Sequence, residues 1–167
     1  MKSKIIIPVV LMLLAVACKP DDIGSQGDPY LTIITDMTCK EPSGVKGNQP
    51  GFDQSCVVYN FEGDSVLIIN HYNASFNCCP EEILVDFEIK GDSLIIREDD
   101  REELCRCLCL YDVEIRVHNL KKQLYKVRFE EPYVLKDTTQ LIFNMDLRED
   151  PIGHVCVTRN YFPYLWQ

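Results

Sequence analysis

Cysteine alternates with other residues in the stretch LCRCLCLYDVEIRV, which spans positions 104–117. Cys105, Cys107 and Cys109 occupy every second position, and the alternation continues through apolar residues to position 117. In a β-strand every second side chain points to the same face, and such neighbours lie about 6.6 Å apart along the strand. The stretch therefore predicts a strand that carries three sulfurs on one face. Because these sulfurs are badly placed to bond one another, we expect each to reach another segment.

The same period of two recurs along the chain, while helical periodicity is almost absent. The alternating or apolar runs are residues 30–35, 56–61, 65–70, 82–89, 93–98, 105–117, 125–129, 141–147 and 154–162. Gly-Asp pairs at 63–64 and 91–92 each separate two runs, and these residues suit the positive φ angles of a tight hairpin turn. The sequence predicts an all-β fold of about nine strands, arranged as an antiparallel sandwich or barrel.

The N-terminus carries the features of an export signal. Lys2 and Lys4 begin an apolar stretch at positions 5–14 that is too short to span a bilayer and is typical of a secretory signal. The residues LAVAC, which end at Cys18, resemble the lipobox of bacterial lipoproteins. This resemblance implies a signal peptide at 1–17, acylation of Cys18 and a membrane anchor made of lipid. The alternative is a plain secretory signal that is cut after AVA.

The rest of the chain divides into a tether and one domain. Residues 18–29 are polar and contain proline and glycine, which predicts a lipidated cysteine followed by a flexible tether. Residues 30–167 are long enough for a single domain with a hydrophobic core. The formal net charge of −9 argues against nucleic acid as a partner and against adhesion to anionic lipid.

The cysteine count favours a disulfide framework. The chain has nine cysteines, and an even number remains when the lipidated Cys18 is set aside. An even set in an oxidising compartment is what a disulfide framework requires. The eight cysteines that we expect to form disulfides are Cys39, Cys56, Cys78, Cys79, Cys105, Cys107, Cys109 and Cys156.

The adjacent Cys78 and Cys79 constrain the pairing. A bond between neighbours needs a strained ring, and Pro80 favours extended geometry at Cys79. We expect these two cysteines to bridge two of the three alternating cysteines. The third alternating cysteine then pairs within the group that contains Cys39, Cys56 and Cys156, in an order that the sequence leaves open.

Metal binding is the main alternative for the cysteines. Five thiols could hold zinc or copper, which both prefer sulfur, namely those of Cys78, Cys79, Cys105, Cys107 and Cys109. Against this, the chain has no Cys-x₂-Cys, and its three histidines, His71, His118 and His154, do not flank these cysteines. A third interpretation is that the cysteines are free, buried thiols. We therefore predict no metal and no cofactor.

Several motifs together carry a family resemblance. They are CCPEE with the hairpin that follows, CxCLCLYDVE, the return strand Y-x-V-x-F and the closing C-x-T-R-x-Y-F-P, within residues 76–163. They resemble a group of small cysteine-rich lipoproteins of Bacteroidota. The resemblance implies an Ig-like or transthyretin-like β-sandwich, anchored to the outer membrane on its periplasmic or outer side, and it implies no activity.

Three tripeptides match the pattern that Bacteroidota use for O-glycosylation of exported proteins. Their acceptor residues are Ser65, Ser93 and Thr138, each preceded by aspartate. The first two also lie where hairpin turns are expected, and exposed turns are where such modification occurs.

The sequence contains none of the common catalytic signatures, so we expect a protein that is not an enzyme. The function that we predict is a lipid-anchored structural or interaction module of the cell envelope, with a protein or glycan partner that the sequence does not identify. The alternatives are a thiolate metal-binding protein and a small-ligand carrier with a cavity inside a barrel.

Overall fold

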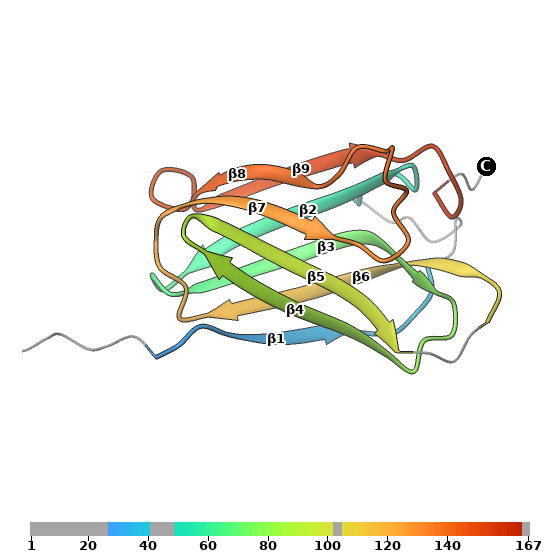
Figure 1. Ribbon diagram of the computed structural model, residues 1–167, viewed down its shortest axis with the longest axis horizontal. Coiled ribbons are helices and arrows are strands. Elements are labelled where there is room, and N and C mark those ends of the chain that lie inside the picture. The colour runs from blue at the N-terminus through green and yellow to red at the C-terminus, as the bar shows by residue number, and fades with distance from the viewer. Residues whose placement is uncertain (1–26, 41–48, 102–104, 165–167) are drawn as a thin grey trace, which may run out of the picture.

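The computed structural model describes residues 27–40, 49–101 and 105–164, and the fold within these ranges is all-β (Figure 1). Its strands are β1 (Tyr30–Thr35), β2 (Gln54–Glu62), β3 (Val66–Asn77), β4 (Glu82–Lys90), β5 (Ser93–Arg101), β6 (Leu108–His118), β7 (Leu124–Glu130), β8 (Ile142–Asp146) and β9 (Ile152–Thr158). The predicted signal peptide, Cys18 and most of the predicted tether lie outside the described residues. The described ranges contain no helix with the length and hydropathy that a membrane crossing requires.

The strands form two sheets that pack face to face, which confirms the predicted β-sandwich (Figure 1). One sheet has the order β1-β6-β3-β2-β9, and the other has the order β4-β5-β7-β8. All pairs are antiparallel except β5 with β7, which run parallel. The chain crosses from the first sheet to the second after β3, returns for β6, and then crosses again for β7, so segments distant in sequence become neighbours.

The two predicted hairpins are present, and their turns use the expected glycines. β2 pairs with β3 through Glu62↔Val66, and both Gly63 and Asp64 have positive φ. β4 pairs with β5 through Lys90↔Ser93, and Gly91 has a φ of 63°. A residue with a Cβ is strained at such angles, which explains the glycine in each turn.

The core lies between the sheets and follows the period of two. Inward residues of β2, β3 and β6 meet inward residues of β5 and β7, and all of them are almost completely buried. The main contributors are Val57, Tyr59, Phe61, Leu67, Ile69, Val113, Ile115, Val117, Leu94, Ile96, Tyr125, Val127 and Phe129. These side chains fill the space between the sheets.

One predicted strand begins later than its pattern indicates. The alternation starts at Cys105, whereas β6 begins at Leu108, so that Cys105 and Cys107 precede the strand and only Cys109 lies within it. The physical reason is the neighbouring strand: β3 ends at Asn77, whose ladder partner is Leu108, and among the described residues no strand continues beside those that precede Leu108. The three sulfurs therefore do not share one pleated face.

Candidate functional site

The domain cysteines are joined in four disulfides, which confirms the predicted disulfide-stapled fold. The pairs are Cys39–Cys109, Cys56–Cys156, Cys78–Cys107 and Cys79–Cys105. The two adjacent cysteines thus join two of the three alternating ones, and the third joins the segment after β1. In this state none of these eight sulfurs is a thiolate, the form in which cysteine binds metal.

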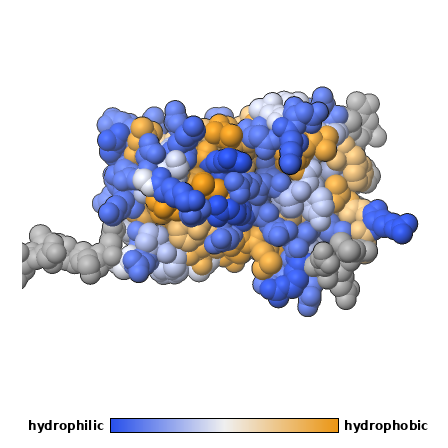
Figure 2. Space-filling view, viewed as in Figure 1, coloured by the Kyte–Doolittle hydropathy of each residue, from blue (hydrophilic) through white to orange (hydrophobic). Residues whose placement is uncertain are grey.

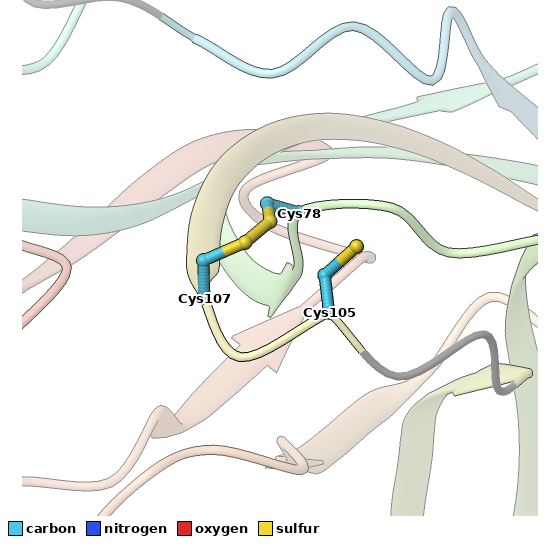
Figure 3. A group of neighbouring side chains, drawn as sticks. All are labelled: Cys78, Cys105 and Cys107. Atoms are coloured by element: carbon cyan, nitrogen blue, oxygen red, sulfur yellow. A yellow bond between two sulfur atoms is a disulfide. The ribbon is translucent and has the colours of Figure 1, made fainter.

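Two of the disulfides lie side by side where β3 leaves its sheet and where the chain approaches β6. The sulfurs of Cys78, Cys105 and Cys107 all lie within 4.8 Å of one another, and none of these residues is buried. In Figure 3 the Cys78–Cys107 bond spans the two segments, with the Cys105 sulfur beside it. Together with Cys79, the partner of Cys105, they form what we name the cysteine cluster.

Asn77 holds the two segments of the cysteine cluster together by hydrogen bonds. Its side-chain amide donates to the carbonyl of Cys105 at 2.7 Å, and its side-chain oxygen accepts from the backbone N–H of Cys79 at 3.0 Å. Across the same junction the N–H of Cys78 donates to the carbonyl of Cys107 at 3.2 Å. The buried hydroxyl of Tyr111 donates to the carbonyl of Asn77, which fixes this residue against β6.

A second polar cluster lies between the sheets and is buried. His71 on β3 and Glu98 on β5 face each other, with 2.8 Å between Nδ1 and Oε1. The other ring nitrogen of His71 lies 2.9 Å from the hydroxyl of Ser55 on β2. The rings of His71 and Phe129 meet in a T-shaped contact, with 5.1 Å between their centroids, so the histidine is enclosed by both sheets.

Two further ions complete this buried ionic cluster, which we define as His71, Glu98, Glu131 and Arg159. Glu131 follows β7 and places Oε1 3.8 Å from Nε2 of His71. Its other oxygen accepts a hydrogen bond of 2.7 Å from Arg159, which follows β9. The guanidinium also donates to the carbonyl of Thr139 and lies over the ring of Tyr164. The cluster thus joins β3 and β5 to the segments after β7 and β9.

The charges of the ionic cluster balance when His71 is protonated, because two cations then face two carboxylates. Burial by itself lowers the pKa of His71, but Glu98 and Glu131 outweigh it, so the pKa lies above its ordinary value. Burial also raises the pKa of Glu131, against the opposing effect of His71 and Arg159. Both shifts mean that the folded cluster holds its protons more tightly than the unfolded chain does.

The order Ser55–His71–Glu98 is that of a serine hydrolase triad, in which the histidine takes the proton of the serine. A triad acts only where a substrate carbonyl can approach the serine. Ser55 and His71 each have a relative exposure of 0%, so the hydroxyl is closed to substrate in this conformation. The same atoms serve to satisfy one another inside the sandwich, where an unpaired polar group is costly.

The ionic cluster also contains donor types that metals use. His71, Glu98 and Glu131 each offer one ligand atom within 4.8 Å of the others. Both ring nitrogens are already engaged by protein partners, and Arg159 supplies positive charge to Glu131. One oxygen of each carboxylate is thus paired with a protein group, by His71 for Glu98 and by Arg159 for Glu131, while the second oxygen of each is buried without a hydrogen-bond partner.

Sequence reasoning missed the ionic cluster although the period of two contains a signal for it. His71 continues the inward series of Leu67 and Ile69, and Glu98 continues that of Leu94 and Ile96. A charged residue in phase with a buried face is a rare event that calls for a partner. What the pattern could not tell is which charges would meet, since that depends on how the sheets pack.

The three predicted O-glycosylation acceptors lie at turns and are half-buried. Ser65 closes the β2–β3 turn, and Ser93 begins β5 after the β4–β5 turn. Thr138 lies in the loop before β8, where its hydroxyl donates to the carbonyl of Leu135 at 2.7 Å. Each acceptor therefore stands at a connection, and none lies inside the core.

Comparisons with family models, with curated proteins and with solved structures found no match to this chain.

Proposed function

We propose that this protein is a lipid-anchored structural or interaction module of the cell envelope and that it is not an enzyme. The observation that carries the proposal is the use of all eight domain cysteines in disulfides. Such a framework fits an extracellular or envelope protein, because disulfides persist where the environment is oxidising. The predicted lipobox at Cys18 and the resemblance to lipoproteins of Bacteroidota support attachment to the outer membrane.

The sheet edges support an interaction role. β1 and β9 are the edges of one sheet and β8 is an edge of the other, and each carries an exposed isoleucine. The exposed fractions are 53% for Ile34, 67% for Ile152 and 47% for Ile142. Figure 2 shows hydrophobic side chains exposed between hydrophilic ones on the face that it views. Edge strands with free backbone groups and apolar side chains are suited to contact an extended segment of another protein.

The structure gives less support to the alternative of a small-ligand carrier. A carrier needs an enclosed apolar cavity, whereas buried side chains of both sheets meet in one hydrophobic cluster here. Pockets of about 420 Å³ lie at the surface of the described residues, one of them beside Asn119, Lys121 and Tyr125. This pocket is lined by polar and apolar groups alike and lies at the loops.

The anchor and the interaction role are tested separately. In cells that process lipoproteins, we expect the mature chain to begin at Cys18, to carry the mass of acyl groups and to sediment with membranes, whereas Cys18→Ser remains unacylated.

The interaction role is tested by crosslinking at the sheet edges. A photo-crosslinking amino acid at Ile34 or Ile152 should capture a discrete partner. The matched control is the same amino acid at Asp86 on edge strand β4, an exposed position that lies among the charged side chains of Glu88 and Arg97. Equal capture at all three positions would contradict an interaction through the apolar edges.

The proposal of no enzymatic activity has its own test. Because the Ser55–His71–Glu98 arrangement is enclosed, a fluorophosphonate probe should leave the folded protein unlabelled. Labelling that disappears in Ser55→Ala would show that the serine is a nucleophile and would overturn this part of the proposal.

A further inference from the structure

We propose that the cysteine cluster, when both of its disulfides are reduced, forms a tetrathiolate site for a soft divalent cation such as Zn²⁺. The site consists of Cys78, Cys79, Cys105 and Cys107, and it goes beyond the proposed envelope module. The first support is the position of the sulfurs, since three of them lie within 4.8 Å of one another and the fourth is bonded to one of these.

The distances suit a tetrahedral ion. Zn–S bonds of about 2.3 Å place the sulfurs of a tetrahedral site about 3.8 Å apart. The sulfurs of Cys78 and Cys107 therefore need to approach that of Cys105 by about 1 Å at most, and bonded sulfurs need to separate by less than about 2 Å. Cys79 lies outside this close group, and its side chain has to turn toward Cys78 and Cys107 to supply the fourth sulfur. All four cysteines lie on connections outside the strands, where such shifts leave the sheets intact.

The hydrogen bonds around Asn77 give the second support, because they do not depend on the disulfides. The bonds of Asn77 to Cys105 and Cys79, and that between the backbones of Cys78 and Cys107, join the same two segments without sulfur. These hydrogen bonds therefore keep the four cysteines close together after reduction. Since none of Cys78, Cys105 and Cys107 is buried, an ion can reach the site from solvent.

The chemistry of the change is balanced. A dithiol or phosphine reductant supplies two electrons to each disulfide, which breaks the Cys78–Cys107 and Cys79–Cys105 bonds and, with two protons each, leaves four thiols. A dithiol is oxidised to its cyclic disulfide and supplies the protons itself, whereas a phosphine is oxidised to its phosphine oxide by taking the oxygen atom of a water molecule, which also supplies the two protons. Zn²⁺ then forms four bonds to sulfur, and the thiol protons pass to solvent as the thiolates form.

Cobalt(II) is the probe for the experiment, because its thiolate charge-transfer and visible bands report a tetrahedral sulfur site. We expect the full chain reduced with a phosphine to bind one Co²⁺ per chain, the oxidised chain to bind none, and Zn²⁺ to displace the cobalt. Cys79→Ser with Cys105→Ser should lose these bands. The matched control is Cys56→Ala with Cys156→Ala, which removes a different disulfide and should keep them.

Asn77→Ala tests the positioning role of the hydrogen bonds. It should weaken cobalt affinity at least tenfold, as the loss of groups that orient ligands does in other sites, while far-UV circular dichroism confirms that the sheets persist. Cobalt bands of equal strength in the reduced wild type and in the Cys79, Cys105 variant would overturn the proposal, because the ion would then be held elsewhere. The absence of cobalt binding by the reduced wild type or by the reduced control variant would overturn it as well.

Discussion

The buried ionic cluster joins residues of both sheets, and the cysteine cluster joins the two connections that run between the sheets, yet the two clusters do so by opposite means. The ionic cluster joins His71, Glu98, Glu131 and Arg159 by charge, in a place from which water is excluded. The cysteine cluster joins its segments by covalent bonds at partly exposed connections. Exposed ion pairs contribute little to stability, whereas a disulfide acts mainly on the unfolded chain and does not need burial.

The two clusters differ in which change removes their contribution to the stability of the fold. Charges inside the sandwich stabilise it only as a complete set, since a partner left alone is an unpaired charge in a medium of low dielectric. A disulfide leaves no unpaired charge behind when it is lost, and its contribution disappears only when it is reduced. The ionic cluster should therefore respond to single substitutions and to pH, and the cysteine cluster to reductant.

The largest effect is expected when one member of the ionic cluster is removed. Arg159→Met leaves Glu131 buried without its arginine partner, and we expect the free energy of unfolding to fall by about 3–5 kcal/mol. The measurement is urea unfolding of the oxidised protein at pH 7. Combining Arg159→Met with Glu131→Gln removes both charges and should restore part of the loss.

The matched control for this prediction is Arg148→Met. Arg148 makes an equally short ion pair with Asp146, at 2.7 Å, but the arginine side chain is 55% exposed. We expect little change in unfolding from its loss. Similar losses for Arg148 and Arg159 would contradict the view that burial gives the ionic cluster its importance.

Removal of a disulfide should have the next largest effect, and its size should depend on the loop that the bond closes. Each bridge typically contributes about 2–4 kcal/mol. The Cys56–Cys156 bond spans a separation of 100 residues, and Cys79–Cys105 spans 26. From loop-closure entropy, the double alanine variant of the first pair should lose at least about 1 kcal/mol more than that of the second, because Cys78–Cys107 still closes almost the same loop when Cys79–Cys105 is removed.

Urea unfolding without reductant measures this difference directly. An equal loss for both variants would show that the two bonds contribute through contacts in the folded state, and not through the unfolded chain. Because the Cys56 sulfur is buried between neighbouring strands, a third variant with serine at Cys56 and Cys156 separates the cost of a cavity from the cost of the lost bond.

The sequence predicted the links of one cluster far better than those of the other. Adjacent Cys78 and Cys79 are badly placed to bond each other, and this local restriction alone indicates bonds to the alternating cysteines, whatever the pairing of the strands. The start of β6 could not be predicted from the alternation, because it is set by the end of β3 at Asn77. The need of adjacent cysteines for other partners can be inferred from neighbouring residues, but the length of a strand depends on the strand beside it.

For the ionic cluster, the local sequence pattern indicates only two of the four members. His71 and Glu98 are in phase with the inward residues of their strands, so their burial could be expected. Glu131 and Arg159 lie just beyond β7 and β9, and they meet because the two strands belong to different sheets that pack together. The parallel pairing of β5 with β7, which brings the segment after β7 toward Glu98, has no local signature either.

The smallest effect that we predict is a slope of stability with pH, and it distinguishes the two clusters because disulfides do not titrate. The pKa of His71 is raised in the folded state, so its contribution is fully present below the unfolded pKa of about 6.5 and is lost as the pH rises through the folded pKa. The raised pKa of Glu131 acts in the same direction from about pH 4.3 upward.

The free energy of unfolding should therefore fall as the pH rises above 6.5, by at most about 1.4 kcal/mol per pH unit for one extra proton held by the folded state. Urea unfolding between pH 5 and 9 measures this slope, and His71→Gln should reduce it while also lowering stability overall. His154→Gln changes an exposed histidine and should leave the slope as in the wild type. If His71→Gln and the wild type share one slope, the imidazole is not held protonated by its two carboxylates. Arg159 is then the only cation of the ionic cluster that balances the charge of Glu98 and Glu131.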